Sequence, residues 1–111
     1  MSWFMVMMNQ YPHVLEKIRA ELRVKLPSLV SGETLIPSMD DLPQLVYLEA
    51  AIRENLRLSP VLPLGAREAN RDTVLCDGTP VPKGTRVTLA LYSASRKPEI
   101  WGDDALEFKP E

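Results

Sequence analysis

The charged residues with the most informative spacing are Glu54 and Arg57, which form the pattern E-x-x-R. Three positions apart on a helix, they lie on one face and can form an ion pair. An exposed pair of this kind is common and contributes only about a few tenths of a kcal/mol. Arg57, however, is followed closely by Ser59-Pro60 and an extended segment that can cover the pair. A covered pair can act as a clamp on a third group.

Few other side chains have the types or spacing needed for chemistry. His13 lies at an expected helix start and is predicted to be at the surface, and Cys76, beside Asp77-Gly78, is predicted to be a half-buried small hydrophobe. A single cysteine excludes an intrachain disulfide, and no CxxC or Cys/His cluster suggests a zinc site. The sequence has no set of nucleophile, histidine and acid either. A self-contained hydrolase or metal enzyme is therefore set aside.

The composition is that of a small globular protein. The 111 residues include 13 Lys and Arg against 15 Asp and Glu, with 45% hydrophobic residues, which allows one small domain at most. A net charge of -2 gives no electrostatic footprint for nucleic acid or an anionic membrane. The longest apolar run, Trp3 to Met8, is far shorter than the roughly 20 residues of a spanning helix. Alone, these features predict a soluble intracellular chain without a membrane segment.

The elements that would position Glu54 and Arg57 are helices separated by prolines. We predict helices over 1–10 and from Pro12 to about residue 25, and a surface loop over 27–37. The charged face of the second helix is interpreted as solvated. Residues 38–41 fit a capping box, and the main helix is expected over 44–58. Its continuous buried seam is predicted from apolar residues at helical spacing: Leu45, Leu48, Ile52 and Leu56.

After Pro60 the pattern changes to short strands. Residues 61–69 are expected to be extended, Asp77-Gly78 predicts a hairpin between 73–76 and 79–81, and 85–92 alternates as a strand does. A polar helical turn and an irregular tail follow. The predicted fold class is α+β, mainly α with a small β region.

Several motifs now carry a family resemblance. Residues 47–60, which include E-x-x-R, resemble the K helix of the haem-thiolate monooxygenases, the cytochrome P-450 superfamily. Ser2-Trp3-Phe4 with Tyr11-Pro12 resembles the end of its I helix and the start of helix J, and 77–85 resembles its small β hairpin. Residues 101–111 resemble the segment that leads into its P-E-R motif. Four motifs in order span the chain, which implies that 1–111 is a partial P-450 domain and no complete independent domain.

The resemblance implies a role for particular residues. Glu54 and Arg57 match the buried K-helix pair, whose third partner is an Arg after P-E; Pro110 and Glu111 match the start of that motif. Arg67 matches a basic position that meets a haem propionate, with a surface arginine as the alternative. Residues matching the substrate-pocket loop, which could otherwise be a Pro-bent apolar connector, are Val61, Leu62, Leu64 and Gly65. No catalytic residue and no metal ligand is assigned.

The resemblance also implies an activity for a full-length parent. Such an enzyme inserts one oxygen atom from O2 into a C–H bond of a lipophilic substrate, using haem and electrons from NADPH through a reductase, at the endoplasmic-reticulum membrane. Ser2-Trp3-Phe4 and the sequence near Trp101 look most like the branch that hydroxylates fatty acids and alkanes. The family's axial-cysteine loop and most of its I helix are not in this sequence, so we expect the chain alone to be inactive. The alternative is a non-catalytic truncated product or a partner-dependent interaction module.

Overall fold

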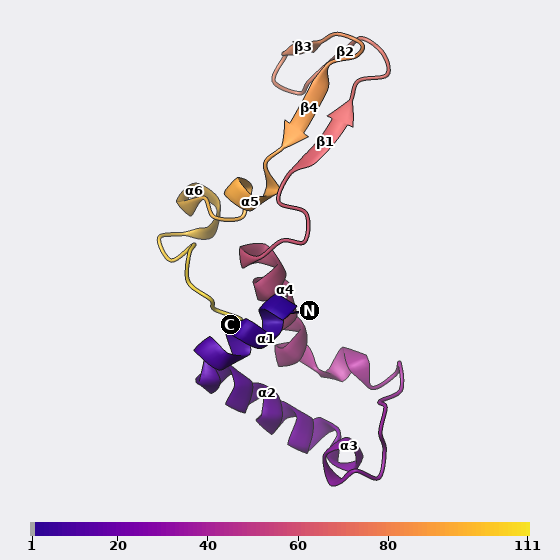
Figure 1. Cartoon of the computed structure of the whole chain (residues 1–111), viewed down its shortest axis with the longest axis vertical. Coiled ribbons are helices and arrows are strands. Elements are labelled where there is room, and N and C mark those ends of the chain that lie inside the picture. Colours follow the sequence, from indigo (N-terminus) through magenta and orange to yellow (C-terminus); the bar gives the residue numbers. More distant parts are fainter. Residues whose placement is uncertain (1) are drawn as a thin grey trace. The chain divides into compact units, whose positions relative to one another are not determined.

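The structure, a computed structural model, describes residues 2–111 and divides into two compact units (Figure 1). The first comprises Met1–Ser59 with Leu106–Glu111, and the second comprises Pro60–Ala105. The first unit is helical, and the second holds the strands and two short helices. The predicted class, mainly α with a small β region, is confirmed.

The first unit is built on three helices that pack against one another: α1 (Ser2–Gln10), α2 (Pro12–Lys25) and α4 (Val46–Leu58). Pro12 stands in the first turn of α2, where its missing N–H costs nothing. The predictions for these helices hold within two residues at each end, and Met1 lies outside the described residues. None of the helices in residues 2–111 is long and apolar enough to cross a membrane.

The segment between α2 and α4 differs from the prediction. Residues 27–37 were expected to form a loop, but Pro27–Ser31 form the short helix α3. Pro27 is its first residue, and Gly32, with φ 83°, is its C-cap. Residues 38–41 form a turn rather than a helix start, and a 3-10 helix, η1 (Leu42–Gln44), precedes α4. Local capping signals were therefore present, but they belong to a turn and to shorter helices.

The core of the first unit lies between α1, α2, α4 and the returning C-terminal segment. Its buried members are Met8, Val14, Ile18, Ala51, Leu58 and Phe108. The predicted seam of α4 is wrong in part: Leu45 is buried and Leu48 half-buried, but Ile52 and Leu56 are 36% and 45% exposed. The helix instead turns its small Ala51, with Asn55 and Leu58, into the core. A small residue such as Ala51 allows helices to approach each other closely. The predicted seam considered only large apolar side chains and therefore missed it.

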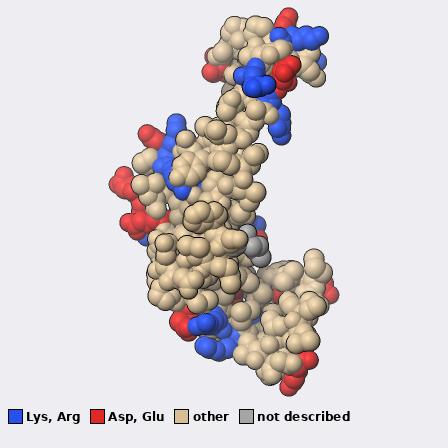
Figure 2. Space-filling view, in the orientation of Figure 1, with Lys and Arg blue, Asp and Glu red and all other residues tan. Residues whose placement is uncertain are grey.

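The second unit contains two small antiparallel sheets. β1 (Gly65–Glu68) pairs with β4 (Arg86–Leu89), and β2 (Thr73–Val74) pairs with β3 (Pro80–Val81). The predicted hairpin is confirmed, with Gly78 at φ 87° in its turn. Two short helices follow, α5 (Leu91–Ala94) and α6 (Pro98–Trp101). On the face drawn in Figure 2, acidic and basic side chains occur together in both units.

Candidate functional site

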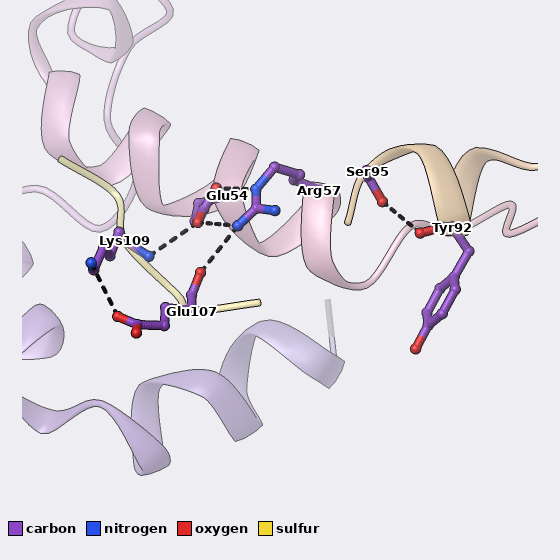
Figure 3. A network of polar contacts seen from close by, with 6 residues as sticks. All are labelled: Glu54, Arg57, Tyr92, Ser95, Glu107 and Lys109. Carbon is purple, nitrogen blue, oxygen red and sulfur yellow. Dashed lines mark hydrogen bonds and ion pairs between the residues drawn. The ribbon is translucent and has the colours of Figure 1, made fainter. Parts of the chain in front are cut away.

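The polar centre of the first unit is the pair Glu54–Arg57 on the last turns of α4 (Figure 3). Arg57 donates from Nε to Oε2 of Glu54 and from Nη2 to Oε1, both at 2.7 Å. The side chains are only 9% and 13% exposed. A bidentate, charge-assisted pair of this kind has a fixed geometry because the planar guanidinium matches the carboxylate.

The same two side chains hold the backbone of the returning segment. Nη2 of Arg57 donates to the carbonyl oxygen of Glu107 at 3.0 Å, and the backbone N–H of Lys109 donates to Oε1 of Glu54 at 3.0 Å. We call Glu54, Arg57 and the backbone of 107–109 the clamp. Phe108, between the two backbone contacts, is buried in the core and packs against the ring of Tyr11. The clamp thus fixes an otherwise irregular segment onto α4.

The final two residues contact the other side of this unit. Pro110 is buried, and the Glu111 carboxylate forms an ion pair with Lys17 of α2. This hydrogen bond lowers the pKa of Glu111 and raises the pKa of Lys17. The Lys17 ammonium also lies 5.6 Å from the ring centroid of Tyr47. No sequence pattern singled out Lys17, because its partner Glu111 lies 94 residues further along the chain.

Two buried polar atoms on α4 have no hydrogen-bond partner among the described residues: the hydroxyl of Tyr47 and Oδ1 of Asn55. Burial raises the pKa of the Tyr47 phenol, with a smaller opposing effect from the Lys17 charge. An unpartnered buried group costs about 1–3 kcal/mol, so these atoms weaken rather than support this unit.

Arg67 lies on β1 in the second unit, with its side chain exposed. Its Nη1 donates to the carbonyl oxygen of neighbouring Ala66 at 3.0 Å. Because Arg67 pairs with Val87 and Gly65 with Leu89, these four residues share one face of the ribbon. An exposed guanidinium beside apolar side chains fits the carboxylate of a largely apolar ligand, and a haem propionate is such a group.

The predicted pocket-loop residues form the connection into β1. Val61, Leu62 and Leu64 are exposed, whereas Gly65 is buried. A Cβ atom at position 65 would make ordinary van der Waals contacts with Leu89 at 3.7 Å and with Leu62 at 3.9 Å, so Gly65 lies beside these two apolar residues. The carbonyl oxygen of Pro63 accepts a hydrogen bond from the backbone N–H of Tyr92 at 3.0 Å, which ties this connection to the start of α5. In the same turn of α5, the Ser95 hydroxyl donates to the carbonyl oxygen of Tyr92 at 3.0 Å (Figure 3).

The remaining candidates lie at the surface. His13 is exposed, as predicted, and its ring meets that of Tyr11 edge-on. Cys76 was expected to be half-buried but is exposed, because the two-residue strands beside it leave nothing to cover it. Across residues 2–111, no group of three or more His, Cys, Asp or Glu side chains could hold a metal ion.

Comparison with known proteins gives a consistent result. The profile of the family described as Cytochrome P450 matches residues 1–111. Alkane hydroxylase MAH1 of Arabidopsis thaliana is 33% identical, Cytochrome P450 94A1 of Vicia sativa 39%, and Beta-amyrin 24-hydroxylase of Glycine max 38%; each match covers all of this chain. In each case the chain spans only about 20% of the relative's length. A solved structure of a zebra fish cytochrome P450 with progesterone is 33% identical with a TM-score of 0.85, over 98% of this chain and 24% of that one.

Proposed function

The chain belongs to the cytochrome P450 family, and we propose that it is a segment of a haem-dependent monooxygenase that hydroxylates a lipophilic substrate. The observation that carries this proposal is the match to relatives over the whole chain, together with a likeness to a solved relative at TM-score 0.85. The clamp supports it, because Glu54 and Arg57 pair and hold the segment that contains the expected P-E residues.

We propose that this segment contributes support and ligand contacts rather than reacting groups. When bound, haem supplies the oxygen chemistry of this family. Arg67 would hold a propionate through its guanidinium, and the apolar side chains of Val61, Leu62 and Leu64 would contact the substrate and exclude water. Glu54 and Arg57 would keep the returning segment in place.

For the substrate, we propose an alkane or a fatty acyl chain. The name of one relative, an alkane hydroxylase, supports an alkane, and the resemblance of the Ser2-Trp3-Phe4 and Trp101 stretches supports the same branch. We further propose that electrons come from NADPH through a reductase and that the complete protein works at the endoplasmic-reticulum membrane.

The test begins with the transcript on both sides of this reading frame, followed by expression of the complete product. We expect the reduced protein with carbon monoxide to show the absorption band of thiolate-ligated haem, and we expect it to hydroxylate alkanes or fatty acids with NADPH and reductase. A triterpene substrate serves as the comparison. A transcript that neither continues into a cysteine loop nor yields a haem protein would refute the proposal.

A matched pair of variants tests Arg67 in that product. Arg67→Ala should lower the haem retained after purification several-fold, because a charge-assisted contact to the propionate is lost. Arg71→Ala, which removes another exposed arginine just beyond β1, should retain haem as the unaltered protein does. Equal retention in both variants would exclude a propionate role for Arg67.

One observation favours the alternative of an interaction module. A groove of about 530 Å³ runs beside α4, lined mainly by apolar residues that include Leu42, Leu45, Leu48 and Ile52. If the 111-residue chain is a product of its own, it should bind a hydrophobic dye or self-associate through this surface. If the purified chain sediments as a monomer and does not bind the hydrophobic dye, this alternative is refuted.

A further inference from the structure

The N-terminus of α4 has no cap from its own neighbourhood. Leu45 occupies the N-cap position, and it has no side-chain acceptor to offer. The nearby carboxylate of Asp41 instead accepts the backbone N–H of Ser38 at 2.8 Å within the preceding turn. The N–H groups of the first helical turn therefore need an acceptor from elsewhere.

That acceptor is Glu21 of α2. Its Oε1 accepts the backbone N–H of Tyr47 at 2.8 Å, and its Oε2 accepts that of Leu48 at 3.0 Å. Glu21 is half-buried, and it lies 26 residues before the first group that it caps. Both carboxylate oxygens thus serve successive N–H groups at the positive end of the helix dipole, where a negative charge is favourable.

The position of Glu21 relates it to the clamp. Lys17, one turn earlier on α2, forms the ion pair with Glu111. The face of α2 that carries these two residues therefore contacts both the start of α4 and the end of the segment that α4 clamps. Because α4 is a continuous helix over Val46–Leu58, fixing its first turn also sets where Glu54 and Arg57 stand relative to 107–109.

We propose that Glu21 is a positioning residue that caps α4 from α2 and thereby holds the Glu54–Arg57 clamp in register with the returning segment. From the sequence, the charged face of α2 was interpreted as solvated. On this proposal, Glu21 on that face instead caps α4. This proposal concerns residues 2–111 only and does not depend on haem or on any substrate.

Hydrogen exchange followed by mass spectrometry on the complete protein that carries this chain tests the proposal. Glu21→Ala should speed exchange about tenfold in a peptide covering 46–50, as expected for loss of a helix cap. It should also speed exchange several-fold in the peptides covering 53–58 and 105–111. Glu21→Gln keeps one carbonyl acceptor at the same reach and should restore part of the protection in all three peptides.

Glu16→Ala is the control, because Glu16 lies on the same helix but is exposed and pairs only locally with Arg19. It should leave the three peptides unchanged. If Glu21→Ala changes exchange at 46–50 by less than twofold, Glu21 is not the cap. If it loosens 46–50 but leaves 53–58 and 105–111 as they were, or speeds exchange equally in 65–69 of the second unit, the positioning role is refuted. If Glu21→Ala does not fold, hydrogen exchange in Glu21→Gln decides between the outcomes. Partial protection of the three peptides is the expected result, and protection equal to that of the unaltered protein refutes the proposal.

Discussion

We expect a single substitution of Glu54 or Arg57 to lower the stability of the protein strongly. The double substitution should cost less free energy than the sum of the two single substitutions. The Glu54 and Arg57 side chains are 13% and 9% exposed and share two hydrogen bonds of 2.7 Å. Glu54→Gln removes the carboxylate charge that pairs with the nearly buried guanidinium, and Arg57→Met removes the guanidinium that pairs with the nearly buried carboxylate. Each should therefore cost about 3–5 kcal/mol of local stability.

The double variant does not pay twice, because neither uncompensated charge remains. It still deprives the carbonyl of Glu107 of its contact with Arg57, at about 1–3 kcal/mol, whereas the amide oxygen of the glutamine can still accept the N–H of Lys109. We therefore expect the double variant to be more stable than the sum of the single effects by at least about 1 kcal/mol, within the usual range for residues in contact.

The assay is native-state hydrogen exchange of the amides in α4, which gives opening free energies for this helix in the complete protein. The control is the exposed pair Glu49–Arg53 on the same helix, with side chains 55% and 77% exposed. Glu49→Gln and Arg53→Met should each cost less than about 1 kcal/mol. Effects of the Glu54 and Arg57 substitutions that add to within about 0.5 kcal/mol, or that match those of the control pair, would refute the reasoning.

Three further predictions concern single groups. Tyr47→Phe should leave the thermal midpoint unchanged or raise it, because the deleted hydroxyl is buried without a partner among the described residues; a drop of several degrees in a thermal scan would show that the hydroxyl has one. Lys17→Ala should raise the pKa of Glu111 towards its ordinary range in an NMR titration. The pair stabilises the fold above the unfolded pKa of Glu111 and below that of Lys17. Its contribution is lost as the pH falls through the lowered pKa of Glu111 or rises through the raised pKa of Lys17. The backbone N–H of Thr79 lowers the pKa of Asp77, so the hairpin turn is stabilised above the unfolded pKa of Asp77 and loosens as the pH falls through the lowered value; a Thr79 amide signal that titrates at an ordinary carboxyl pKa would contradict this.

Local signals in the sequence were sufficient for the elements that depend on a few neighbouring residues. Prolines divided the helices, Asp77-Gly78 specified the hairpin, and the spacing of Glu54 and Arg57 placed them on one helix face. Each of these features follows from backbone dihedral preferences or helical periodicity within about one turn. The motif order was likewise enough to indicate the family.

The tertiary structure decided which side of each element is buried and what each polar group meets. The period of α4 fits two faces, and the fold buries the one with Ala51 because α1 and α2 approach it closely, leaving Ile52 and Leu56 exposed. The backbone partners of the clamp lie 50 and 55 residues away from Arg57 and Glu54, and the Glu21 cap lies 26 residues before Tyr47. Sequence spacing holds no information on such contacts, since a hydrogen bond between distant residues exists only once packing has brought their segments together.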